Sequence, residues 1–170
     1  MVSNLGRAGE MKATLGTLAA ALVATLAVVP LAHGVEPTRD SYRERVEPIC
    51  KRDTLRSRRI LRGAQQRIRT QKLVPAGRQF IRASSTFGRA VGQLVRVPRP
   101  PADAARLKKW FKFLRIVQMR LRILGKRLVE EERIKATHAS INLERSANAA
   151  NNVSFVFEFD YCRLTRSRFG

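Results

Sequence analysis

The chain has 170 residues, a length that suits one domain better than two. Its 34 lysine and arginine residues, set against 13 acidic residues, give a formal net charge of +21. This charge favours anionic partners and carries no information about the fold. The sequence contains no glycine-rich phosphate loop and no nucleophile or zinc-protease motif, so we expect no enzyme, no metal and no cofactor.

Residues 1–34 have the pattern of a secretory signal peptide. A short basic start precedes residues 13–32, which are almost uniformly small and apolar, and residues 32–34 supply a small-x-small cleavage site. The alternative is an uncleaved anchor formed by residues 13–32, because about 20 apolar residues can span a bilayer. In either case we expect the rest of the chain to be exported, either extracellular or associated with the cell envelope.

The first predicted helix runs from about Arg39 to Gln71, with Thr38 or Asp40 as its N-cap. Pro48 lies inside this range, so the helix either begins close to Glu47 or is kinked at the proline. Its polar face carries many arginines, and like charges on a helix surface repel each other. Tertiary packing must therefore stabilise this helix more than its intrinsic helix propensity does. The apolar side is formed by Tyr42, Val46, Ile49, Cys50, Leu61, Ala64 and Ile68.

A second helix is predicted from about Ala76 to Val95, after a break at Pro75-Ala76-Gly77. The prolines of the Val97–Pro101 segment then force an extended turn. Asp103 is the expected N-cap of the next helix. The buried side of the second helix is formed by Phe80, Ala83, Phe87, Ala90, Val91 and Leu94.

The third helix, Arg106 to Val129, is the element on which we expect the other helices to pack. Apolar residues recur in it at alternating spacings of three and four, which places them on one stripe of a helix. This stripe consists of Leu107, Trp110, Leu114, Val117, Leu121, Leu124 and Leu128. The opposite arc carries Lys108, Lys109, Lys112, Arg115, Arg122 and Lys126.

The basic arc of the third helix is the candidate site for an anionic ligand. Aromatic residues stand beside cations in Lys108–Lys112, as in helices that lie at a membrane interface. The alternative is that Trp110 and Phe111 belong to the core and that the lysines lie on the solvent-facing side of the same helix. Further apolar residues beside the arc (Phe113, Ile116, Met119 and Ile123) favour a central position in a bundle over a second binding surface.

The acidic run Glu130-Glu131-Glu132 is expected to begin a fourth helix, because anionic side chains suit a helix N-terminus. Asn151-Asn152 is expected to end or soften this helix. The apolar and small positions predicted along the helix are Ile134, Ala136, Thr137, Ile141, Leu143, Ala147 and Ala150.

Residues 153–162 alternate between aromatic or aliphatic and mostly polar side chains, which is strand periodicity. A lone strand has no ladder partner, so we expect an extended segment that lies across the helices with its aromatic side inward. A continuation of the fourth helix is the alternative. Residues 163–170 form a basic tail.

Cys50 and Cys162 are the only cysteines. Two cysteines in an exported chain predict one disulfide, which would tie the aromatic segment to the first helix. A redox site is the alternative, but the chain has no CxxC motif.

A set of spaced residues extends over nearly the whole mature chain: Tyr42, Glu47-Pro48-Ile49-Cys50, the Val97–Pro101 turn with Asp103, Ala149-Ala150-Asn151-Asn152, and Phe157, Phe159 and Tyr161-Cys162. This pattern resembles small exported actinobacterial proteins of unknown function. The resemblance implies a helical domain with paired cysteines and carries over no catalytic residue.

Few residues could support catalysis or metal binding. His138 is the single histidine of the mature chain, and consecutive glutamates at 130–132 point in different directions. Glu158 and Asp160 would share one side of an extended segment, as paired carboxylates for acid–base chemistry would require. Pairing with the abundant arginines is the simpler interpretation.

Together these patterns predict an all-α, four-helix bundle-like domain over residues 35–162, with one disulfide. We expect a non-enzymatic binding or structural role toward anionic envelope polymers, lipid head groups or a protein partner. Single-stranded nucleic acid could use the same cations, but export argues against it. The alternatives are a membrane-active or self-associating helical protein, and an enzyme of unrecognised type that uses Glu158, Asp160 or His138.

Overall fold

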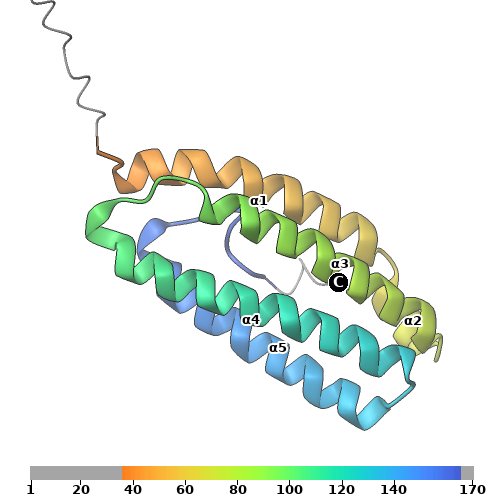
Figure 1. The fold of residues 1–170 in the computed structure, drawn as a ribbon. Coiled ribbons are helices and arrows are strands. Elements are labelled where there is room, and N and C mark those ends of the chain that lie inside the picture. Colours follow the sequence, from red (N-terminus) through yellow and green to blue (C-terminus); the bar gives the residue numbers. More distant parts are fainter. Residues whose placement is uncertain (1–35, 166–170) are drawn as a thin grey trace, which may run out of the picture. The chain divides into compact units, whose positions relative to one another are not determined.

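The fold was analysed in a computed structural model, which describes residues 36–165 (Figure 1). The expected signal peptide, the cleavage site and the end of the basic tail lie outside these residues. The described chain is all-helical, as predicted. Its elements are α1 (Arg39–Leu61), α2 (Ala64–Arg69), α3 (Leu73–Val95), the 3-10 turn η1 (Pro101–Asp103), α4 (Ala104–Val129), α5 (Arg133–Ser154) and the 3-10 turn η2 (Phe155–Phe157).

The four long helices alternate in direction along the chain and pack in sequence order (Figure 1). Helix α3 lies between α1 and α4, and α4 lies between α3 and α5. After η2, residues 158–165 turn back along the helices and are joined to α1 by the disulfide. We call residues 158–165 the strap. It brings the last described part of the chain to the first helix.

Helix α1 begins where the sequence predicts and ends earlier. The Thr38 hydroxyl accepts from the Ser41 N–H at 3.2 Å, and the Ser41 hydroxyl accepts from the Thr38 N–H at 3.0 Å, which forms a capping box. Pro48 lies within the helix, so a start near Glu47 is wrong. The predicted continuation to Gln71 is also wrong, because Gly63 adopts φ +74° and separates α1 from α2.

Helix α3 begins at Leu73, three residues before the predicted start. Pro75 therefore lies in its first turn, where a proline is tolerated because the N–H groups have no intrahelical partner. Gly77 faces Gly125 of α4: a Cβ at Gly77 would lie 2.5 Å from the Gly125 carbonyl oxygen. The backbones of α3 and α4 therefore meet directly at this crossing.

The predicted core stripe of α4 is confirmed, since all seven of its residues are buried. Trp110 is fully buried, and its ring lies 5.1 Å from the ring of Phe159, which stacks on Phe157 at 5.3 Å. Tyr42 of α1 packs on Phe157 at 5.9 Å. Aromatic rings from three distant parts of the chain thus form one cluster in the core.

Helix α5 differs from its prediction in two respects. The acidic run forms the turn before the helix, with Glu131 at φ +56° and Glu132 at the N-cap position. Ile134 and Ile141 lie on the helix, as predicted, and are 76% and 43% exposed. The helix also continues through Asn151-Asn152 to Ser154. Its buried side consists of small residues and one leucine: Ala136, Ala139, Leu143, Ala147, Ala150 and Ser154.

The strand-like pattern at residues 153–162 does not form a strand among residues 36–165. The first two residues continue α5, η2 follows, and Glu158 at φ +50° turns the chain into the strap. Inward packing of the aromatic side is confirmed for Phe157 and Phe159, and it is wrong for Phe155 and Tyr161, which are 78% and 36% exposed.

Candidate functional site: a basic face on helix α4

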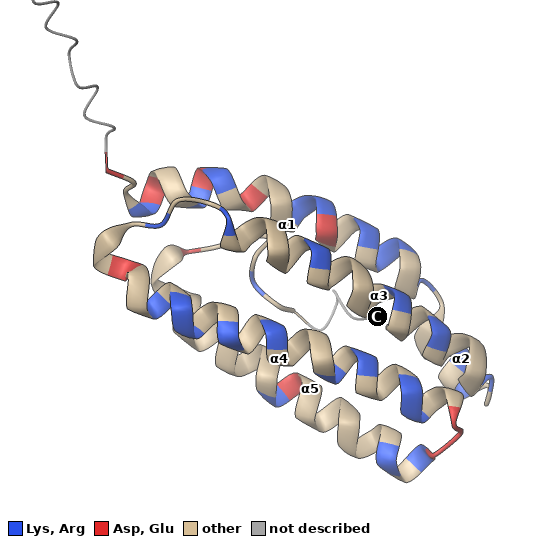
Figure 2. Cartoon of the chain, viewed as in Figure 1, with Lys and Arg blue, Asp and Glu red and all other residues tan. Residues whose placement is uncertain are grey.

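The basic arc predicted on the third helix is a solvent-exposed face of α4. Because its residues follow the core stripe by one or two positions, burial of the stripe turns them toward solvent. At a rise of about 1.5 Å per residue, the face extends for about 27 Å along the helix. Figure 2 shows lysine and arginine along the length of α4. The basic face consists of Lys108, Lys109, Lys112, Arg115, Arg122 and Lys126, all exposed.

No cation of the basic face forms an ion pair with an acidic residue among residues 36–165. The carboxylates that form ion pairs do so with other cations, among them Glu130 and Glu132 with Arg127, and Glu158 with Arg43. Like charges three and four positions apart on a helix repel each other. An anion placed among these cations would relieve that repulsion. Binding of a negatively charged ligand to the basic face is therefore electrostatically favourable.

The N-terminal half of the basic face surrounds a shallow, open depression of about 600 Å³. Its rim is formed by Lys108, Lys109, Lys112 and Arg115. Apolar atoms lie between these cations, because Ala105, Ile116 and Met119 line the same depression and Met119 is 49% exposed. Phe113 and Ile123 instead pack against the core, as predicted for a central helix. The site therefore combines a cationic rim with a small apolar floor.

Asp103 occupies the N-cap position of α4, as predicted, but its side chain forms no capping hydrogen bond. Its buried carboxylate instead accepts two hydrogen bonds from Arg39, from Nε at 2.7 Å and from Nη2 at 2.8 Å. The hydrogen bonds from Arg39, assisted by the charge of Arg106, hold the pKa of Asp103 below its usual value against the opposing effect of burial. The pair joins the start of α1 to the start of α4.

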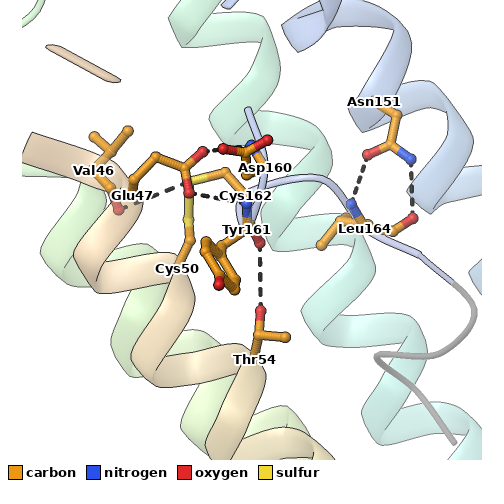
Figure 3. The surroundings of a disulfide bond; sticks show 9 residues. All are labelled: Val46, Glu47, Cys50, Thr54, Asn151, Asp160, Tyr161, Cys162 and Leu164. Carbon is orange, nitrogen blue, oxygen red and sulfur yellow. Dashed lines mark hydrogen bonds between the residues drawn. A yellow bond between two sulfur atoms is a disulfide. The ribbon is translucent and has the colours of Figure 1, made fainter. Parts of the chain in front are cut away.

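The disulfide is part of a structural site (Figure 3). Cys50 and Cys162 are bonded, as predicted, and both are buried. The Glu47 carboxylate accepts from the backbone N–H groups of Asp160 and Tyr161 at 2.8 and 2.9 Å. The sequence pattern did not predict this role of Glu47. Its position three residues before the cysteine, on the same helix face, is the only signal that could have suggested it.

The strap is held at a second point on α5. Asn151 donates from its side-chain amide to the Leu164 carbonyl at 2.9 Å and accepts from the Leu164 N–H at 2.8 Å (Figure 3). Asn151 was expected only to end or soften a helix. It satisfies both backbone polar groups of a buried strap residue instead.

The groups considered for catalysis do not come together. His138 is exposed on α5, and Glu158 and Asp160 are exposed on the strap. Glu158 pairs with Arg43 at 3.6 Å. Within residues 36–165, no group of three or more histidine, cysteine or acidic side chains is placed to hold a metal ion. Over the same part of the chain, no helix has the length and apolar character needed to cross a membrane.

Comparisons with protein-family models, with curated proteins and with solved structures found no match to this chain. The class of protein is therefore defined by its own features. These are an all-helical domain with one disulfide, a buried aromatic cluster and an exposed basic face.

Proposed function

We propose that the chain is an exported, non-enzymatic protein of the cell envelope that binds closely spaced anionic groups through the basic face of α4. One observation carries the proposal: six exposed cations lie along one helix with no acidic partner among residues 36–165. Export is supported by the signal-like residues 1–34, by the resemblance to exported actinobacterial proteins, and by a disulfide that suits an oxidising compartment.

The ligand chemistry follows from the spacing of the cations. Phosphate or carboxylate groups repeated along an envelope polymer, or displayed by anionic lipid head groups, can contact several of these side chains at once. Such attraction is screened over about 8 Å at physiological ionic strength, so binding must weaken steeply with salt. The floor formed by Ala105, Ile116 and Met119 adds apolar contact of the kind that lipid head-group regions accommodate.

The proposal is tested by co-sedimentation of the oxidised chain 35–170 with purified cell walls, anionic vesicles and neutral vesicles over a salt series. A variant carries Lys108→Glu, Lys112→Glu and Arg115→Glu on the basic face. The matched control carries Arg45→Glu, Arg52→Glu and Arg56→Glu on exposed positions of α1 and has the same net charge. We expect the α4 variant to bind about 100-fold more weakly at low salt. The control should lose much less.

The results separate the possible partners. Binding to walls alone identifies a polymer, and binding to anionic vesicles identifies lipid head groups. Equal loss in the α4 variant and the α1 control would show that only net charge matters, which would refute a defined site. Salt-resistant binding to neutral vesicles would support the alternative of a membrane-active helix instead.

A further inference from the structure

A second hollow, of about 870 Å³, lies along the side of α5 that faces α2 and the start of α3. Its lining on α5 extends from Arg133 to Asn151, which is about 27 Å of helix at 1.5 Å per residue. The strap enters the hollow at its far end, where Arg163, Leu164 and Thr165 contribute to the lining. We call this hollow the edge groove. It lies on a different side of α4 from the basic face, since it is lined by core-stripe residues.

The floor of the edge groove is apolar and continuous with the core. Each of its main residues belongs to the core cluster and retains between 3% and 6% exposure. The groove therefore reaches the core from solvent instead of being a surface depression. The floor residues are Leu73, Phe80, Leu124, Leu128, Leu143 and Ala147.

The rim of the edge groove is polar and has an arginine at each end. Arg133 begins α5 at one end, and Arg163 lies on the strap at the other. Neither forms an ion pair with a described acidic residue. Glu144 is the single carboxylate of the lining, and it is engaged in an interaction of its own within the chain. The groove thus offers an anionic group two positions, one at either end.

The volume of the edge groove suits a small molecule. It lies within the range of about 300–1,000 Å³ that is usual for small-molecule sites. A long, slender and mostly apolar molecule with one charged end matches the length, the floor and the two arginines.

We propose that the edge groove binds a long-chain fatty acid, with its acyl chain on the apolar floor and its carboxylate beside Arg133 or Arg163. A carboxylate suits a single arginine because the guanidinium fork can donate two parallel hydrogen bonds to it. This inference goes beyond the proposed function and depends on different residues. A protein of this kind would carry an acyl chain independently of its attachment to an anionic surface.

The test measures displacement of parinaric acid, a fluorescent fatty acid, by palmitate from the oxidised chain 35–170, below the critical micelle concentration. Ser140 is exposed and lines the groove, so Ser140→Trp places an indole in the groove without replacing a core residue. His138→Trp is the matched control, because His138 is exposed on the same helix and does not line the groove. We expect Ser140→Trp to weaken palmitate binding at least about tenfold and His138→Trp to leave it unchanged.

The charge of the head group is tested separately. Arg133→Gln or Arg163→Gln should weaken palmitate binding about tenfold, and the affected arginine locates the carboxylate. Hexadecyltrimethylammonium, which has the same chain length and a cationic head, should bind much more weakly than palmitate. Circular dichroism of each variant verifies that the helices are retained.

Four results would overturn the inference. Unchanged binding in Ser140→Trp, or equal binding of the cationic amphiphile, would show that the groove is not the site. Loss of palmitate binding in the triple-glutamate variant of α4, with Ser140→Trp unaffected, would place the fatty acid on the basic face and leave the proposed function intact. Binding that requires removal of residues 166–170 would identify the C-terminal tail as the occupant of the groove.

Discussion

At the residue scale, Tyr42 shows how burial alone can set the chemistry of a side chain. Its ring is fully buried beside Phe157, and its hydroxyl has no hydrogen-bond partner among residues 36–165. Burial raises the pKa of the phenol far above its usual value, and the nearby charge of Arg99 opposes this only in part. The phenol therefore stays neutral in the folded protein at pH values where the unfolded chain ionises.

We expect Tyr42→Phe to stabilise the protein by about 1 kcal/mol at neutral pH, because it removes a buried polar group that forms no hydrogen bond. In the parent protein, stability should fall as the pH rises above about 10, since only the unfolded state then loses the phenolic proton. Tyr42→Phe should lack this part of the pH dependence. Urea unfolding of both proteins at neutral and alkaline pH measures each effect, and a less stable phenylalanine variant would contradict the assignment.

At the element scale, the contact between α3 and α4 depends on two glycines. A Cβ at Gly125 would lie 2.8 Å from the Gly77 carbonyl oxygen and 2.9 Å from the Ile81 backbone nitrogen. These neighbours are backbone atoms, which cannot move aside as a flexible side chain can. Gly125 is therefore the residue of α4 that allows the two helices to approach.

Gly77→Ala and Gly125→Ala should each destabilise the protein by about 1–3 kcal/mol, because the added methyl groups force the helices apart. Gly92→Ala is the matched control, since a Cβ at Gly92 of α3 would meet nothing within 4 Å. That control should stabilise by about 0.4–1 kcal/mol through reduced freedom of the unfolded chain. Denaturant unfolding of the three variants tests the crossing, and equal effects at all three positions would contradict it.

At the scale of the whole molecule, contacts between the two ends of the domain hold the strap in place. The disulfide joins residues separated by 112 positions, and the Glu47 carboxylate binds the backbone next to it. Asn151 fixes the strap on α5. The strap thus places Phe159 against Phe157 of η2 in the aromatic cluster and closes the bundle between its first and last helices.

Replacing both Cys50 and Cys162 with serine should cost up to about 4–5 kcal/mol, because the unfolded chain regains the entropy of a very long loop. Reduction of the parent protein should have a similar effect. Glu47→Gln should cost less, since an amide oxygen still accepts one of the two backbone hydrogen bonds. Thermal unfolding under oxidising and reducing conditions measures the difference. An unchanged midpoint on reduction would show that the strap is held without the disulfide.

Much of the candidate site could be predicted from the sequence. The basic face is the arc opposite a regular apolar stripe, so the helical period alone places Lys108 and Lys126 on it. Met119 was recognised as lying beside this arc, but its exposure depends on how closely α3 and α5 cover α4. The edge groove could not be predicted, because its lining comes from four helices and the strap.

The sequence by itself determined the features that depend on neighbours within a few positions. These are the helical class, the buried stripe of α4, a first-helix N-cap at Thr38 or Asp40 and, through the cysteine count, the disulfide. Tertiary structure decided the features that depend on partners far along the chain. The Asp103 carboxylate accepts hydrogen bonds from Arg39 instead of capping α4. The Glu47 carboxylate accepts a hydrogen bond from a strap residue more than a hundred positions later. The physical reason is that periodicity and capping act within one or two turns, whereas burial and pairing are settled only when distant helices pack.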